Sequence, residues 1–174
     1  MMSTTPKTVN VLQGEFAISD RPDEIITTVL GSCISVCLTD SVRGMSGMNH
    51  FLLPKGGDKT STSMRYGANA MELLINGMLK KGAERDRLEA KIFGGADIIG
   101  NGRGIGASNA LFARGFLEDE GIQVAAESVG GFKARRIRLW PTTGVVRQML
   151  IDEVPVDDPA PPVAKPVAPD VVLF

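Results

Sequence analysis

The side chains that could carry out thiol chemistry lie close together in the N-terminal third of the chain. The sequence contains two cysteines, Cys33 and Cys37, and one histidine, His50. A cysteine thiol with an ordinary pKa of about 8.5 is mostly protonated at neutral pH, and a neighbouring imidazole can activate it as a nucleophile. These residue types therefore predict acyl-transfer chemistry, provided that the fold brings a cysteine and the histidine together.

Cys33 is the better candidate for the nucleophile. It follows Gly31 and Ser32 at a break between two apolar runs, where backbone N–H groups can turn toward a ligand. Cys37 lies within an apolar run and fits a packing role. Purely structural roles for the thiols and for the histidine stay open at this point. A metal site built from the three side chains is less favoured, because structural zinc sites take four ligands.

A hairpin is expected to bring Cys33 and His50 together. Runs rich in β-branched residues predict strands, separated by a polar turn. The strands are expected at residues 24–30, 34–39 and 45–53, and the turn at residues 40–44. Folding the chain about Val42 places His50 beside Cys33 and Ile34. A slip of one residue in this register would move the imidazole to the other face of the sheet.

A catalytic histidine also needs a group that holds its orientation. Thr27 and Thr28 both lie on the strand that precedes Cys33, and either hydroxyl could serve. The residue pattern by itself leaves the choice between them open.

The rest of the chain predicts an α/β scaffold of several strands and two main helices. Apolar residues recur at three- and four-residue steps between Ala68 and Leu79, which indicates an amphipathic helix. A second helix is expected at residues 107–120, with Leu111 among its buried residues. Further strands are expected within residues 9–17, 87–93, 122–127, 134–140 and 145–151, and loops at residues 55–63 and 94–106.

Length, composition and charge exclude several classes of protein. The 174 residues predict one domain over residues 1–152. Residues 153–174 hold six of the ten prolines and predict a disordered tail that is dispensable for activity. The net charge of -1 argues against nucleic acid or an anionic membrane as a partner. No apolar run is long enough to span a membrane and no signal sequence is evident, so a cytoplasmic protein is expected.

Two further patterns have simple structural interpretations. Gly102, Gly104 and Gly106 alternate, and so lack the spacing of a dinucleotide-binding loop. A cluster of basic residues is expected on a solvated strand edge. The alternative is that this cluster binds an acidic protein helix. The cluster consists of Lys133, Arg135, Arg136 and Arg138.

Five segments of the chain resemble the CheD family of chemoreceptor glutamine deamidases from bacterial chemotaxis. The most specific features are Gly31-Ser32-Cys33 and, further along, Met48-Asn49-His50. The segments occur in family order at residues 30–40, 47–54, 89–96, 105–110 and 130–136.

The resemblance implies an amidohydrolase that converts receptor glutamines to glutamates through a cysteine thioester. It implies Cys33 as nucleophile, His50 as base and Thr27 as the orienting group, because the family threonine lies six residues before the cysteine. The implied fold is a layered sandwich of mixed, largely antiparallel β-sheet with two main helices, similar to the catalytic domain of cytotoxic necrotizing factor toxins. No metal or organic cofactor is implied.

The resemblance also bears on partners. Chemoreceptors are the implied substrates, and some members of the family bind the phosphatase CheC. The loops at residues 55–63 and 94–106 are expected to border a site open enough for a protein substrate. A non-catalytic adaptor that binds receptors or the phosphatase is the main alternative function, and a thiol peptidase or transglutaminase-like acyl transferase is the second.

Overall fold

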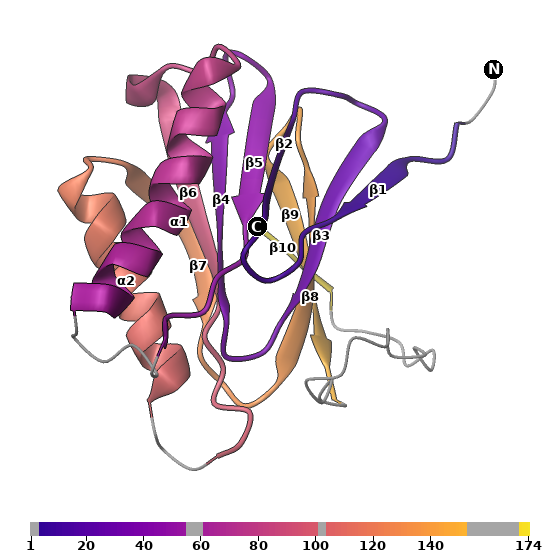
Figure 1. Cartoon of the computed structure of the whole chain (residues 1–174). Coiled ribbons are helices and arrows are strands. Elements are labelled where there is room, and N and C mark those ends of the chain that lie inside the picture. Colours follow the sequence, from indigo (N-terminus) through magenta and orange to yellow (C-terminus); the bar gives the residue numbers. More distant parts are fainter. Residues whose placement is uncertain (1–3, 55–60, 101–103, 153–170) are drawn as a thin grey trace.

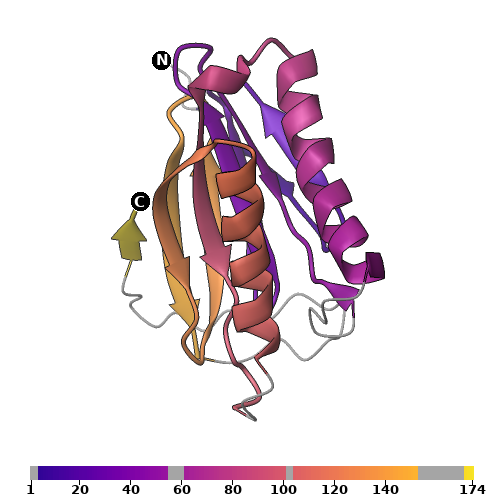
Figure 2. The ribbon, with the colours of Figure 1, turned by 90° about the vertical axis from the view of Figure 1, so that its left-hand side faces the viewer.

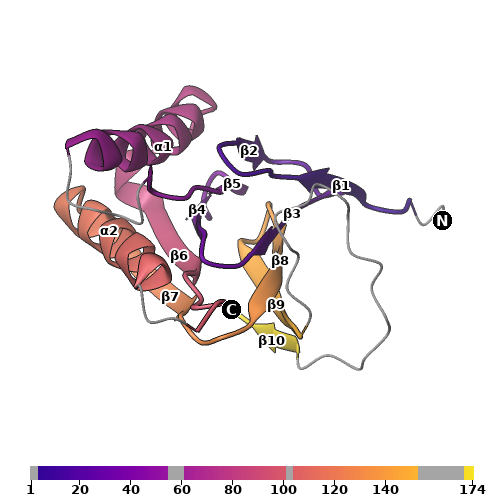
Figure 3. The ribbon, with the colours of Figure 1, turned by 60° about the horizontal axis from the view of Figure 1, so that its bottom comes forward.

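Two helices and two β-sheets form three layers. The computed structural model describes residues 4–54, 61–100, 104–152 and 171–174. The helices cover one face of the first sheet, and the second sheet packs against its opposite face (Figure 1 and Figure 3). We call the two sheets the helix-side sheet and the outer sheet. This arrangement confirms the predicted α/β class.

The two sheets are mixed and largely antiparallel, as expected. The strands are β1 (Lys7–Asn10), β2 (Phe16–Ser19), β3 (Glu24–Leu30), β4 (Ile34–Asp40), β5 (Met45–Asn49), β6 (Leu88–Gly94), β7 (Gln123–Val129), β8 (Ala134–Trp140), β9 (Val145–Ile151) and β10 (Val171–Leu173). The helix-side sheet has the order β2-β5-β4-β6-β7, and the outer sheet has the order β1-β3-β8-β9-β10. Among the pairs in the described residues, β1–β3 and β6–β7 are parallel and the others are antiparallel.

The helices α1 (Ser61–Lys80) and α2 (Ile105–Asp119) lie side by side on the helix-side sheet (Figure 2). A short 3-10 helix, η2 (Arg85–Arg87), leads from α1 into β6. The predicted apolar face of α1 is confirmed, since Met71, Leu74 and Met78 are fully buried. Leu111 of α2 is 64% exposed, so its predicted burial is wrong. The small side chains Ala110 and Ala113, together with Leu117, bring α2 close to the sheet instead.

β4 and β5 form the predicted hairpin, but its register differs by one residue from the expected one. Ile34 lies opposite Phe51, where the predicted register placed His50. The register is constant along the hairpin, so His50 lies opposite Ser35. Because side chains alternate along a strand, His50 and Cys33 point to the same face, which looks into the core between the sheets.

The chain crosses from the outer sheet to the helix-side sheet twice near its N-terminus. The expected single strand within residues 9–17 is in fact two strands, β1 in the outer sheet and β2 in the helix-side sheet. The second crossing runs from β3 to β4 and carries Cys33 (Figure 1). These two crossings place their connecting segments at the edge of the inter-sheet core.

The C-terminal residues correct the prediction of a disordered tail. Val171–Leu173 form β10, which pairs with β9. Phe174 continues the pairing by exchanging two backbone hydrogen bonds with Val146, at 3.0 and 2.8 Å. Its ring packs edge-on against Phe93, with ring centres 5.4 Å apart. Residues 153–170 of the expected tail, and residues 55–60 of the expected polar loop, lie outside the described residues.

The basic cluster also departs from its predicted setting. Arg135 is 3% exposed and donates to the carbonyl oxygens of Ser128 and Gly130. Burial lowers the pKa of its guanidinium. The expectation of a solvated strand edge is therefore wrong, because Arg135 is buried and β8 is the central strand of the outer sheet. Arg138 is nevertheless exposed to solvent.

The turn between β4 and β5 is organised by the buried carboxylate of Asp40. Its oxygens accept hydrogen bonds from the backbone N–H groups of Val42, Arg43 and Glu84 and from the guanidinium of Arg87. Burial by itself would raise the pKa of Asp40, but these donors outweigh it and lower the pKa to about 2. The contribution of this carboxylate to stability is complete above its unfolded pKa of about 4 and is lost as the pH falls toward about 2.

Asp40→Asn should destabilise the protein by about 2–4 kcal/mol at pH 7, because an amide nitrogen would face donors that need an acceptor. The free energy of unfolding from urea titrations should show this loss, and the gap to wild type should narrow between pH 4 and pH 2. Asp20→Asn is the matched control, since Asp20 makes an exposed ion pair with Arg43. Equal losses in the two variants would contradict the role of Asp40.

Candidate active site

The imidazole of His50 is held by Thr28 and by the backbone of Val11. Nδ1 of His50 lies 2.8 Å from Thr28 Oγ1 and 3.3 Å from the carbonyl oxygen of Val11. The Thr28 hydroxyl donates to the same carbonyl oxygen at 2.7 Å. Val11, Thr28 and His50 are all buried. Three elements, the crossing after β1, strand β3 and the end of β5, therefore meet at this imidazole.

These contacts determine which nitrogen of His50 carries the proton. The carbonyl oxygen of Val11 can only accept, so the single hydroxyl proton of Thr28 goes to it. Thr28 Oγ1 is then an acceptor, and Nδ1 of His50 must be the donor. In the neutral ring, Nε2 is left as the basic nitrogen, which is the arrangement that a catalytic base requires.

The two candidate threonines have different hydrogen-bond partners. The hydroxyl of Thr27 donates to the carbonyl oxygen of Ile137 at 2.7 Å, whereas it is Thr28 that contacts His50. Thr28 and Thr27 point to opposite faces of β3 because successive side chains alternate. The family spacing points to Thr27, whereas the hydrogen-bond partner of the imidazole is Thr28.

Cys33 lies at the edge of the inter-sheet core, on the face that also carries His50. Its thiol donates to Oε1 of Gln13 at 3.7 Å. Gln13 is exposed and sits in the turn that joins β1 to β2. The pattern of residue types gave no signal for Gln13 or Val11, because a polar turn residue and a backbone carbonyl carry no recognisable motif.

The backbone on either side of Cys33 is fixed from the helix side. The carbonyl oxygens of Gly31 and Cys33 accept hydrogen bonds from the backbone N–H groups of Ala96 and Gly95, at 3.0 and 2.8 Å. Between them, the carbonyl oxygen of Ser32 accepts a 2.8 Å hydrogen bond from Nδ2 of Asn109, a fully buried residue of α2. Three consecutive carbonyl groups are thus held by neighbouring segments.

Glycines at the end of β6 and in the first turn of α2 are needed for this close approach. Gly94 has φ +111, and a Cβ there would lie 2.1 Å from the carbonyl oxygen of Cys33. Gly95 and Gly106 also pack backbone to backbone, and a Cβ on Gly106 would lie 2.3 Å from the carbonyl oxygen of Gly95. Residues 94–96 therefore border the site, as expected for part of the glycine-rich loop. Residues 101–103 of that loop lie outside the described residues.

Burial affects the ionisation of His50 and Cys37 in ways that separate their roles. Desolvation lowers the pKa of His50, and its hydrogen bond to Val11 offsets part of this effect. His50 is therefore neutral at pH 7 and available as a base. Burial raises the pKa of Cys37 to about 12. Its thiol stays protonated inside the core between the sheets, which suits packing and not nucleophilic attack.

The described part of the chain holds no group of three or more His, Cys, Asp or Glu side chains arranged to bind a metal ion. Cys37 is fully buried in the core between the sheets, whereas Cys33 is only partly buried at the edge of that core. The three side chains weighed as metal ligands in the sequence therefore do not converge on one point.

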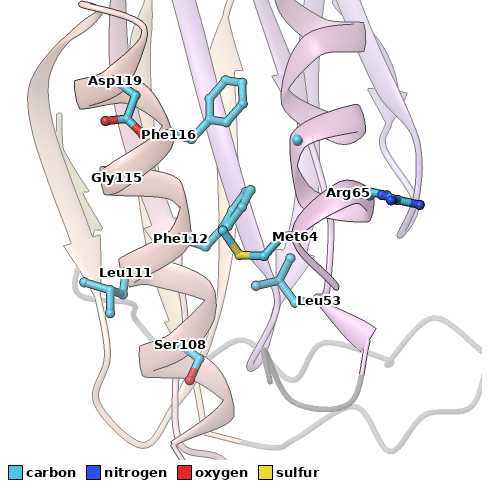
Figure 4. A pocket seen from close by; sticks show the side chains of 10 residues that line it. Leu53, Met64, Arg65, Ser108, Leu111, Phe112, Gly115, Phe116 and Asp119 are labelled. Atoms are coloured by element: carbon cyan, nitrogen blue, oxygen red, sulfur yellow. The ribbon is translucent and has the colours of Figure 1, made fainter. Parts of the chain in front are cut away.

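A large cavity in the described residues is lined by neither Cys33 nor His50. It is a groove of about 670 Å³ between α1 and α2 (Figure 4). Its walls are mainly apolar, and include Leu53, Met64, Leu111 and Phe112. His50 instead borders a cavity of about 40 Å³ with Glu15 and Tyr66 among its walls, enough for a water molecule.

These features define an α/β sandwich with a candidate thiol–imidazole site at one edge of its core. Residues 52–149 match the model of the family described as CheD chemotactic sensory transduction. The chain belongs to the CheD family. The matched region begins just after His50, so it includes neither Cys33 nor His50. Individual relatives span more of the chain.

Such relatives cover nearly the whole protein. A protein of a Caulobacter species named "Probable chemoreceptor glutamine deamidase CheD" is 55% identical over 90% of this chain and 86% of its own length. A protein of Agrobacterium fabrum with the same name is 48% identical over the full length of both chains. The family resemblance read from the sequence is thereby confirmed.

Solved structures add little to this assignment. The hypothetical protein YfiH of Bacillus licheniformis is 14% identical, with a TM-score of 0.46 over 72% of this chain and 60% of that one. A likeness at that level carries no argument, and the similarity to cytotoxic necrotizing factor toxins stays a prediction. None of the helices in the described ranges is both long and apolar enough to cross a membrane.

Proposed function

We propose that this protein is a chemoreceptor glutamine deamidase in which Cys33 is the nucleophile, His50 the general base and Thr28 the orienting group. The observation that carries the proposal is the pair of hydrogen bonds that fix Nδ1 of His50 as a donor to Thr28 and Val11. They leave Nε2 as the base on the face of the hairpin that Cys33 shares. The names of the full-length relatives supply the substrate.

The first half of the reaction forms a thioester. Nε2 of His50 takes the thiol proton of Cys33, and the thiolate attacks the carboxamide carbon of a receptor glutamine. The C=O electron pair moves onto oxygen in the tetrahedral intermediate. The intermediate collapses as His50 returns the proton to the amide nitrogen, and the C–N bond breaks to release ammonia.

The second half hydrolyses the thioester. His50 takes a proton from water, and the hydroxide attacks the carbonyl carbon of the thioester. The C–S bond then breaks, Cys33 regains its proton from His50, and the product is glutamate. General acid–base assistance of this kind typically contributes about 10²–10⁴-fold to a rate. No step draws on a metal or an organic cofactor.

The backbone before Cys33 supports a site for the oxyanion. The carbonyl groups of Gly31, Ser32 and Cys33 are all held on the side of α2 and of residues 95–96. When consecutive carbonyl groups point one way, the intervening N–H groups of Ser32 and Cys33 turn the other way, toward the inter-sheet edge. Each oxyanion donor is worth about 3 kcal/mol in comparable enzymes.

The proposed chemistry also bears on location and partners. A reduced Cys33 is needed for attack, and reduced thiols are typical of the cytoplasm. We therefore place the reaction there, with the cytoplasmic part of a chemoreceptor as substrate. Binding of CheC, which some family members show, is a second possible interaction of the same protein.

The direct test incubates the purified protein with a receptor fragment that contains candidate glutamines. The expected result is the mass increase of a carboxamide-to-carboxylate change at particular glutamines, with one ammonia released for each. Receptor binding without this mass change would support the adaptor alternative. Cleaved or cross-linked receptor would support the peptidase or acyl-transferase alternative.

A further inference from the structure

The turn between β1 and β2 places a glutamine carboxamide of the protein itself on the candidate nucleophile. Oε1 of Gln13 accepts the hydrogen bond from the Cys33 thiol at 3.7 Å. The functional group in this contact is the same one that the proposed reaction consumes. The Gln13 side chain therefore presents to Cys33 the same carboxamide group that a substrate glutamine would present.

The position of Gln13 is built into the backbone. The turn at residues 12–15 is closed by a 2.9 Å hydrogen bond from Glu15 N–H to Leu12 O, and Gly14 has the positive φ of +88 that such a turn requires. Gly14 N–H donates to the carbonyl oxygen of His50 at 2.7 Å, and His50 N–H donates to Glu15 O at 3.1 Å. The segment that presents Gln13 is thus joined to His50.

The same segment supports the base. Val11, two residues before Gln13, supplies the carbonyl oxygen shared by Thr28 and His50. One short stretch of chain therefore fixes the imidazole at one end and covers the thiol at the other. This arrangement is specific to the site and is not a general feature of a surface turn.

The orientation of Gln13 does not suit attack by Cys33. The carboxamide oxygen faces the thiol in this contact. Attack requires the carbonyl carbon at the sulfur and the oxygen at the N–H donors. The tethered side chain therefore occupies the site in an unreactive pose.

We propose that Gln13 is a specificity-determining residue that occupies the place of the substrate carboxamide in the unbound protein. This inference rests on the proposed function. A glutamine presented by a docked receptor displaces Gln13, because protein–protein contacts supply the free energy for the exchange. Free glutamine and small amides lack those contacts and compete poorly with a tethered carboxamide.

The test compares wild type with Gln13→Ala and Gln13→Asn. Asparagine keeps the carboxamide, but its side chain is one methylene shorter and does not reach the Cys33 thiol. Gln13→Asn should therefore behave like Gln13→Ala. Gln123→Ala is the matched control, because Gln123 is an exposed glutamine at the start of β7, away from the turn that carries Gln13. Thermal unfolding checks that each variant is folded.

The first readout needs no receptor. Iodoacetamide carries a carboxamide and alkylates thiols, and its reaction with Cys33 can be followed by mass spectrometry. Both Gln13 variants should be alkylated about three- to tenfold faster than wild type, the size expected for one lost hydrogen bond. Equal rates in wild type and both variants would overturn the proposal.

The second readout is kinetic. Gln13→Ala should lower KM for the receptor with kcat unchanged, and should raise ammonia release from free glutamine by a similar factor. A fall in kcat would make Gln13 a positioning residue and overturn its role as an occupant. A carboxylate found at residue 13 in wild type but not in Cys33→Ala would also overturn the unreactive pose. If no variant deamidates the receptor, the proposed function fails while the alkylation result still decides the role of Gln13.

Discussion

Cys33→Ala is expected to abolish deamidation of a receptor fragment, with a loss of at least about 10⁴-fold in kcat, because no other group can form the thioester. His50→Ala should lower kcat by about 10³-fold through loss of the base. Mass spectrometry of the receptor glutamines, together with ammonia release, measures both losses. Cys33→Ala should fold, since Cys33 is only partly buried. Because His50 is buried, thermal unfolding checks that His50→Ala is folded before its kcat is compared.

Cys37→Ala is the matched control for the thiol. It should keep kcat and lose about 1–2 kcal/mol of stability, because the core between the sheets would gain a small cavity. The pKa of about 12 for Cys37 fits this inert role. A folded Cys37→Ala protein without activity, beside an active Cys33→Ala protein, would reverse the assignment of the nucleophile.

Thr28→Val should lower kcat by about 10–100-fold, the usual cost of removing the partner that orients a functional histidine. Valine cannot accept from Nδ1 of His50, so the ring is free to rotate or to change tautomer. Activity measured between pH 5 and pH 9 checks this, since the effect should persist at pH values where His50 is neutral. Thr28→Ser should keep most of the activity because it keeps the hydroxyl.

Thr27→Val separates the two threonines. Its hydroxyl bonds to Ile137 O and not to the imidazole, so the variant should lose stability without a comparable loss in kcat. If Thr27→Val were the inactive protein and Thr28→Val the active one, the family spacing would be correct and the contact between Thr28 and His50 would have no catalytic role.

Much of the scaffold could be predicted because it depends on local patterns. Strand β3 matches its predicted range, since β-branched residues fill it and Pro22 and Gly31 limit it. The register of the next hairpin was wrong by one residue, because composition locates a turn without defining which residues face each other. That geometry depends on the backbone of the turn, which Asp40 organises.

The parts of the site that could not be predicted depend on contacts between distant segments. Cys33 and His50 were recognisable as residue types, but the choice of threonine required knowledge of the face of β3 on which each lies. The roles of Val11 and Gln13 depend on a crossing between the sheets that no periodicity signals. Strand β10 was missed because three apolar residues after a proline-rich stretch carry too little pattern.

The pairing of β10 with β9 has a practical consequence for the design of expression vectors. The backbone of Phe174 bonds to Val146 and its ring packs against Phe93. Covalent linkage keeps β10 at a high effective concentration beside β9. If the chain were cut within residues 153–170, the peptide that carries β10 would dissociate on dilution. Truncations should therefore keep residues 171–174, and an added affinity tag should not interrupt the pairing of β10 with β9.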